Sequence, residues 1–178
     1  MNQWRLFGAL LAFYAGITLW IGSLVVFGAA VAGVPFEVLS RDTAGVVNRL
    51  ILARLHILEI AGILLIGTGL WLLNLRLRGW QWRLGLVAFV VMVTLFGIYA
   101  GLLEPMMNSI ARAVSFDNPT PETLAAIARF EGYHRLYSLL VGLTVICGVA
   151  LFGWQTWLVV RLLMPSRDAA AGDGAQRS

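Results

Sequence analysis

Four stretches of the chain are almost entirely apolar, and charged residues gather between them. The stretches cover residues 6–34, 57–75, 84–103 and 136–160. The hydrocarbon core of a bilayer is about 30 Å thick, so a helix needs roughly 20 apolar residues to cross it. Each stretch is long enough for one crossing. The pattern therefore predicts an all-α fold, an integral membrane four-helix bundle.

The polar segments between these stretches indicate where the helices begin and end. The first helix is expected over 4–33, because Pro35 biases the residue before it away from helical geometry. The third is expected to run on towards Val114. The second and fourth helices, expected over 43–75 and 121–164, begin well before their apolar stretches. Both are therefore predicted to extend beyond the bilayer on its outer side.

The composition narrows the class of protein. Hydrophobic residues make up 60% of the 178 positions and charged residues 12%, whereas soluble domains average about 25% charged residues. Residues 1–164 are predicted to form one transmembrane domain in the lipid bilayer, and the small, polar tail 165–178 is expected to be disordered. The formal net charge is +4, but the basic residues are scattered, so nucleic acid is not expected as a partner.

Arginines near the span ends predict the orientation of the bundle. The short turn with Arg76, Arg78 and Arg83 lies on the same side as both termini, and acidic residues dilute the arginines of the opposite side. Because short loops rich in arginine stay in the cytoplasm, both termini are predicted to be cytoplasmic. The ionisable residues at the other span ends would then face outwards.

Polar residues on three of the helices point to a single site near the outer rim. Side chains spaced three, four or seven residues apart share one helix face, and on each of these helices the polar face continues a stripe of glycines. Charged groups close to a bilayer point into the bundle and find partners there. The expected polar site consists of Arg41, His56, Glu59, Glu104, Asn108, Arg129, Glu131 and His134.

Several kinds of chemistry are open to this site. The simplest is a network of ion pairs and hydrogen bonds that holds the helix ends together. His56, His134 and Glu104 are also candidate ligands for copper or another divalent metal ion, because imidazole is a common metal ligand. The two histidines alone would suit haem b. A di-metal site is incomplete, since the first helix offers only Glu37, and handling of protons or of a substrate is the remaining interpretation.

Four segments, in this order and spacing, resemble the signature of the transmembrane protein 205-like family. They are 19–23, 39–48, 103–105 and 130–139, with the sequences LWIGS, LSRDTAGVVN, LEP and FEGYHRLYSL. A looser similarity links the chain to copper-resistance D-type membrane proteins. The resemblance implies a four-span protein of the bacterial inner membrane without an agreed activity. Its family-like positions are Arg41, Gly45, Glu104, Pro105 and His134.

We therefore expect a multi-pass, non-enzymatic membrane factor whose outward-facing site serves metal tolerance or transport. In this hypothesis His56 and His134 bind the ligand or accept protons, and Glu104 is their charge partner. Arg41 and Arg129 would neutralise the carboxylates. Two other functions are open: a haem- or copper-binding redox protein, and an accessory subunit or homo-oligomer that docks through glycine-rich helix faces.

Overall fold

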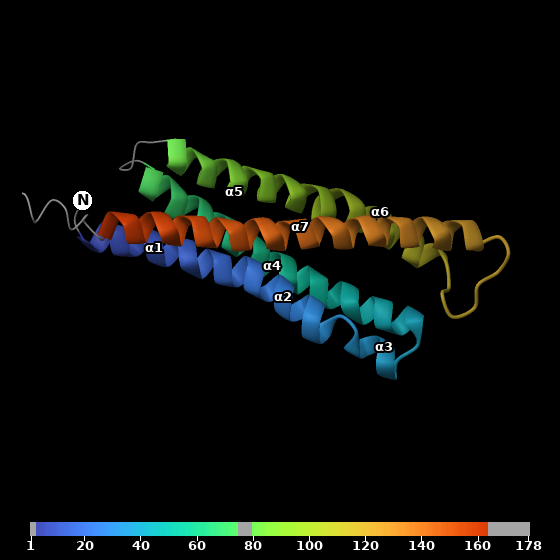
Figure 1. The fold of residues 1–178 in the computed structure, drawn as a ribbon. Helices are drawn as coiled ribbons and strands as arrows, with labels where there is room; N and C mark the ends of the chain where they lie inside the picture. Colours follow the sequence, from blue (N-terminus) through green and yellow to red (C-terminus); the bar gives the residue numbers. More distant parts are fainter. Residues whose placement is uncertain (1–2, 75–79, 164–178) are drawn as a thin grey trace, which may run out of the picture.

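Four long helical segments lie side by side in the computed structural model (Figure 1). The structure describes residues 3–74 and 80–163, and no strand occurs in them. The segments that are long and apolar enough to cross a membrane are Gln3–Val38, Arg41–Leu73, Trp80–Ala113 and Leu124–Arg161. The predicted all-α, four-helix membrane bundle is therefore confirmed. The extension of the second and fourth helices beyond the bilayer stays a prediction, and the predicted tail 165–178 lies outside the described residues.

The first span is a run of short helical pieces. It consists of α1 (Gln3–Ile17), the π-helical turn η1 (Thr18–Gly22), α2 (Ser23–Val26), the π-helical turn η2 (Phe27–Val31) and α3 (Val34–Val38). The sequence predicts that the helix ends at residue 33, but the chain makes only a turn there. Pro35 stands in the first turn of α3. A backbone N–H at this position has no hydrogen-bond partner within the helix, so the lack of an N–H in proline breaks no helical bond. Helix therefore resumes at the proline instead of ending before it.

The other three spans follow their expected courses. The second is α4 (Arg41–Asn74), the third combines α5 (Trp80–Ile98), the π-helical turn η3 (Tyr99–Leu103) and α6 (Glu104–Ala113), and the fourth is α7 (Leu124–Leu163). α7 begins later than the predicted residue 121, because the backbone N–H groups of Thr123 and Leu124 both donate to the carbonyl of Thr120. A local turn thus displaces the start of the helix and leaves the topology unchanged.

Glycines hold α1 and α4 in direct backbone contact. A Cβ atom on Gly62 would lie 2.8 Å from the carbonyl oxygen of Gly16, and a Cβ atom on Gly69 would lie 2.8 Å from that of Ala9. Such small residues let helix backbones approach each other in a membrane, where no hydrophobic effect drives them together. The first two spans therefore pack as one tight hairpin.

The core of the bundle is narrow, and its outside is apolar. Large apolar side chains on the outer faces, such as Leu64 and Ile146, are exposed. A surface of this kind suits contact with lipid tails, which supports the predicted contact with the bilayer. The large apolar side chains buried in the main cluster of the core include Phe13, Trp20, Ile66, Met92 and Leu151.

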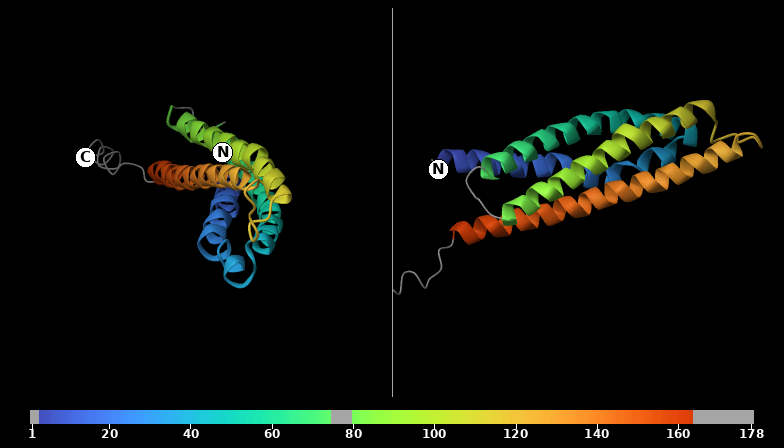
Figure 2. Two further views of the ribbon diagram at one scale, coloured as in Figure 1. Left: turned by 90° about the vertical axis from the view of Figure 1, so that its right-hand side faces the viewer. Right: turned by 90° about the horizontal axis from the view of Figure 1, so that it is seen from above.

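The first two spans form one hairpin, and the last two spans form the other. The two hairpins diverge at the end that carries α3 and the start of α7, where α2 and α3 slope away from α7 (Figures 1 and 2). The segment between α6 and α7 reaches across this end. Asp117 accepts hydrogen bonds from the backbone N–H groups of Arg41 (2.9 Å) and Asp42 (3.2 Å). The carboxylate of Asp42 in turn accepts the Ser115 hydroxyl (2.6 Å) and the Phe116 N–H (2.7 Å). A distant loop thus caps α4, which the sequence next to α4 does not indicate.

Replacement of Gly62 by alanine is expected to destabilise the bundle by about 1–3 kcal/mol, the usual range for overpacking a tight contact. The added methyl group meets backbone atoms of Gly16 and Trp20 in the first span, which cannot turn aside as a flexible side chain would. Unfolding in mixed micelles of rising SDS content measures the effect. Gly97→Ala is the control, because a Cβ atom there meets nothing within 4 Å. Equal stability of the two variants would contradict the close approach.

Candidate functional site

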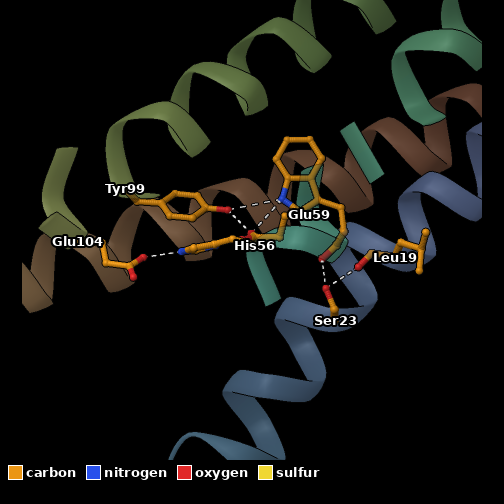
Figure 3. A network of polar contacts seen from close by, with 7 residues as sticks. Leu19, Ser23, His56, Glu59, Tyr99 and Glu104 are labelled. Atoms are coloured by element: carbon orange, nitrogen blue, oxygen red, sulfur yellow. Dashed lines mark hydrogen bonds and ion pairs between the residues drawn. The ribbon is translucent and has the colours of Figure 1, made fainter. Parts of the chain in front are cut away.

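The imidazole of His56 lies between two carboxylates (Figure 3). His56 and Glu59 are one turn apart on α4, and Nδ1 of the ring contacts Oε2 of Glu59. Nε2 contacts Oε2 of Glu104, at the start of α6, at 2.5 Å. The structure thus brings these three predicted site residues together, and the ring joins the second span to the third.

Glu59 is fully buried, and three spans supply its hydrogen-bond partners. Besides His56 on its own helix, the hydroxyl of Tyr99 and Nε1 of Trp20 (3.2 Å) both donate to Oε1 of Glu59. The Glu59 side chain has 0% exposure, against 16% for His56 and 13% for Glu104. A buried carboxylate is tolerated only where such donors replace its lost hydration. The network therefore holds three spans against one another.

Both donors from other helices sit in π-helical turns. Trp20 belongs to η1 and Tyr99 to η3. At the end of η3 the N–H of Glu104 donates to the Tyr99 carbonyl, and Pro105, which follows, has no N–H to donate. π-helical turns are rare and occur frequently at functional sites. Here they aim an indole and a phenol at the same buried carboxylate.

The protons of this network have more than one arrangement. Each contact between the ring and a carboxylate needs a proton to be a hydrogen bond. Either the ring is an imidazolium between two carboxylates, or it is neutral and one carboxyl group is protonated. The two arrangements hold the same protons and carry the same net charge. A proton can therefore move along the chain Glu59–His56–Glu104 without changing the charge that the apolar surroundings accommodate.

Aromatic rings surround the buried end of this chain. Phe96 packs edge-on against His56, with the ring centroids 5.8 Å apart, and against Trp20 at 6.1 Å. Tyr99 packs in the same manner against Phe96 at 5.5 Å and against Tyr137 at 5.4 Å. Edge-to-face contacts of this kind are favourable, and they fill the space around Glu59. The open side of the chain is therefore the one at Glu104.

Glu104 borders a cavity of about 960 Å³ between the two hairpins. The cavity lies at the end where the hairpins diverge. All four spans contribute to its walls, and the third span does so through α6. His56 and Glu59 do not line it but reach it through Glu104. Arg129 is exposed and stands outside the lining. The predicted site residues that line the cavity are Arg41, Glu104, Asn108, Glu131 and His134.

The predicted charge partners differ from those in the structure. Within residues 3–74 and 80–163 the only ion pairs are those of His56 with Glu59 and Glu104. The sequence predicts that Arg41 and Arg129 neutralise the carboxylates, but both are exposed and neither pairs with one. A hydrated guanidinium gains little from an ion pair at the surface. The carboxylates of Glu59 and Glu104 instead share protons with the imidazole that lies between them.

His134 stands apart from the other histidine. Its ring stacks on Phe130, with the centroids 6.2 Å apart, on the wall of the cavity. In the part of the chain that the structure describes, no three or more His, Cys, Asp or Glu side chains form a group that could hold a metal ion. Binding of copper, another divalent metal or haem b by His56, Glu104 and His134 therefore stays a prediction.

Trp20 and Tyr99 are the site residues that the pattern of charged residues does not identify. Both lie inside apolar stretches. Aromatic residues are enriched at the membrane interface, whereas a tryptophan or tyrosine within the hydrocarbon needs a partner for its polar atom. That need is the signal in the sequence which points to them.

These observations define a class of protein: a four-span helical membrane protein with a partly buried Glu–His–Glu chain beside an open cavity. Within this class, the chain belongs to the family described as Domain of unknown function (DUF4149), whose model matches residues 15–115, more than half of the sequence. Comparison with curated proteins and with solved structures found no match.

The family match covers the hydrogen-bonded network completely. Its range, 15–115, includes every residue of that network from Trp20 to Glu104, whereas α7 with His134 lies outside it. Membership fits the expected membrane domain of unknown function. The narrower resemblance to the transmembrane protein 205-like family and to copper-resistance D-type proteins stays a prediction.

Replacement of Tyr99 by phenylalanine is expected to destabilise the bundle by about 1–2 kcal/mol. The expected cost exceeds the average of ~0.6 kcal/mol for interhelical bonds in membranes, because the acceptor is a buried carboxylate. It stays below the ~3 kcal/mol reached by bonds to charged groups, because Trp20 still donates to the same oxygen. SDS unfolding of both proteins measures the difference. Tyr133→Phe is the control, since its hydroxyl has no comparable bond to a buried carboxylate. A cost no larger than that of the control would show that the phenol does not stabilise Glu59.

Proposed function

We propose that this protein is a non-enzymatic membrane factor in which the Glu59–His56–Glu104 chain, called the relay below, takes up and releases protons at an outward-facing cavity. One observation carries the proposal: His56 contacts a carboxylate at each ring nitrogen, and only one of the two carboxylates is fully buried. The other carboxylate, that of Glu104, is part of the cavity wall. A proton that enters from the cavity thus has a continuous route to Glu59.

The position of the relay supports a role in transport. Ionisable residues inside a membrane domain are costly, and they commonly mark proton relays or ligand pathways. A charged solute in the cavity would lie close to Glu104 and would change its affinity for a proton. Binding of the solute and the position of the proton are then linked. Such linkage is what a membrane factor that moves or excludes a solute with the help of protons requires.

In this proposal the cavity faces the outside of a bacterial inner membrane. The opposite end of the bundle carries the starts of α1 and α5 and the end of α7 (Figure 1), and each has an arginine there: Arg5, Arg83 and Arg161. The positive-inside rule supports a cytoplasmic position for that end and for both termini. The starts of α4 and α7 would then project beyond the outer face of the bilayer, as the late onset of their apolar stretches predicts.

Exchange of the His56 Nε2 proton with water tests the relay. In protein with isotopically labelled histidine in lipid nanodiscs, Glu104→Gln is expected to slow this exchange, measured by NMR, by about a hundredfold or more. The reason is that a carboxylate accepts a proton and passes it on, whereas an amide does not. Glu131→Gln is the control, because Glu131 lines the same cavity without contacting His56. Unchanged exchange in Glu104→Gln would refute the relay.

Metal tolerance is the second candidate function. The observation that favours it is that Glu104, Glu131 and His134 line one cavity, together with the thioether-bearing Met107. Carboxylate, imidazole and thioether groups together suit a copper-like ion. These side chains would have to close around the ion, since no such group is assembled in the described ranges 3–74 and 80–163.

Elemental analysis of detergent-purified protein, after incubation with a copper salt and desalting, tests this candidate. The metal function predicts a stoichiometric ion that is lost in His134→Ala, because the imidazole is the strongest of the proposed ligands. Equal metal content in both proteins would remove the metal function and leave the relay untouched. An optical spectrum of the same sample without a haem band would remove the haem alternative.

A further inference from the structure

Arg49 is a partly buried cation that forms no ion pair with any described residue. It lies on α4 and lines the cavity, and its Nη1 atom is buried without a hydrogen-bond partner in the described part of the chain. The neighbouring Asn48 also lines the cavity; its amide nitrogen donates to the carbonyl of Ala32 (2.9 Å), whereas its buried Oδ1 has no partner among the same residues. Unpaired polar groups at such depth are costly. The wall of the cavity at Arg49 is therefore suited to an anion.

The other charged groups around the cavity leave this charge uncompensated. Glu104 pairs with His56, and the carboxylate of Asp42 is occupied by Ser115 and Phe116. Glu131, the third acidic residue of the wall, is exposed and forms no ion pair within the described ranges. No carboxylate of residues 3–74 and 80–163 pairs with Arg49, so an anion from outside the chain can take that place.

The inner part of the cavity is apolar. Leu24 and Phe27 of the first span, Leu52 of α4 and Val141 of α7 line it. Leu52 follows Arg49 by one turn on the same helix face, so the apolar wall begins directly inward of the guanidinium group. A volume of about 960 Å³ is at the upper end of the 300–1,000 Å³ or so that is usual for ligand pockets. A simple inorganic anion would leave most of this space unfilled.

We infer that the cavity binds a lipid-like amphiphile with a phosphate or other anionic head group. The anionic oxygens of the head group lie against Arg49, and the alkyl chain lies between the two hairpins, against Leu24, Leu52 and Val141. This direction matches that of a lipid in the adjacent leaflet, with its head group towards the membrane surface and its chain towards the centre. The inference uses the cavity but does not depend on proton transfer through His56.

Native mass spectrometry with added phosphatidylglycerol tests the inference. Delipidated, detergent-solubilised protein is titrated with the lipid, and Arg49→Gln is compared with the wild type. Loss of charge-assisted hydrogen bonds to the head group is expected to weaken binding by about tenfold or more. Arg54→Gln is the matched control, because Arg54 lies on the same helix, is exposed and does not line the cavity. Equal binding by wild type and Arg49→Gln would overturn the inference.

A second pair of variants tests the apolar part of the site and leaves Arg49 in place. Gly142 lines the cavity, and a Cβ atom there meets nothing within 4 Å, so Gly142→Phe is expected to fill the cavity and abolish lipid binding. Gly153→Phe, with equally open surroundings on the same helix but outside the cavity, is expected to bind as the wild type does. Undiminished binding in Gly142→Phe would place the lipid elsewhere and overturn the inference.

Two further ligands distinguish the source of the anion. Phosphatidylethanolamine, a zwitterionic lipid, is expected to bind more weakly than phosphatidylglycerol, and equal binding would show that the charge of the head group is not recognised. Inorganic phosphate is expected not to displace the lipid. Displacement at millimolar phosphate would identify a site for free anions and would overturn the assignment to a lipid.

The His56 proton exchange of Arg49→Gln is expected to equal that of the wild type, so failure of the relay and failure of the lipid site are separate results.

Discussion

A carboxylate without contact to solvent, that of Glu59, has to find its hydrogen-bond donors inside the bundle. It finds them on three different spans: His56 on its own helix, Trp20 on the first and Tyr99 on the third. In hydrocarbon the alternative to these bonds is an unsolvated charge, which costs far more than any one bond contributes. The rotation and depth of three helices are therefore set by the need to satisfy one side chain.

This requirement accounts for the irregular helices around the site. The donors Trp20 and Tyr99 lie in π-helical turns, which rotate the side chains relative to a regular α-helix. Each turn leaves backbone groups that need compensation. In η1 the carbonyls of Leu19 and Trp20 accept the hydroxyl of Ser23 (Figure 3). In η3 the irregularity precedes Pro105, which has no N–H to offer. The local distortion and the buried network thus support each other.

The two ends of the bundle differ in the way the hairpins meet. Glycines bring α1 and α4 into backbone contact, and this hairpin leaves no room between its helices. At the opposite end the hairpins separate, and the loop bearing Asp117 bridges them at the start of α4. The space that results is lined both by Glu104, at the open end of the hydrogen-bonded chain, and by Arg49, which pairs with no carboxylate in the described part of the chain. A narrow core at one end and a lined cavity at the other suit a protein that binds a ligand within the membrane.

Span length and helical periodicity are local properties, so the four spans and the end of the bundle with the candidate site can be predicted from the chain alone. The same patterns place His56, Glu59 and Glu104 in one predicted group of eight polar residues, since ionisable residues at equal depth on neighbouring helices seek partners. The fold was needed to show that Arg129 stays outside the cavity lining, that His134 stacks on Phe130 and that Trp20 and Tyr99 complete the network. Those outcomes depend on how each helix is rotated about its axis. That rotation is set by the glycine contacts between α1 and α4 and by the hydrogen bonds to Glu59 from π-helical turns of other spans, and no local pattern in the sequence records these contacts between distant segments.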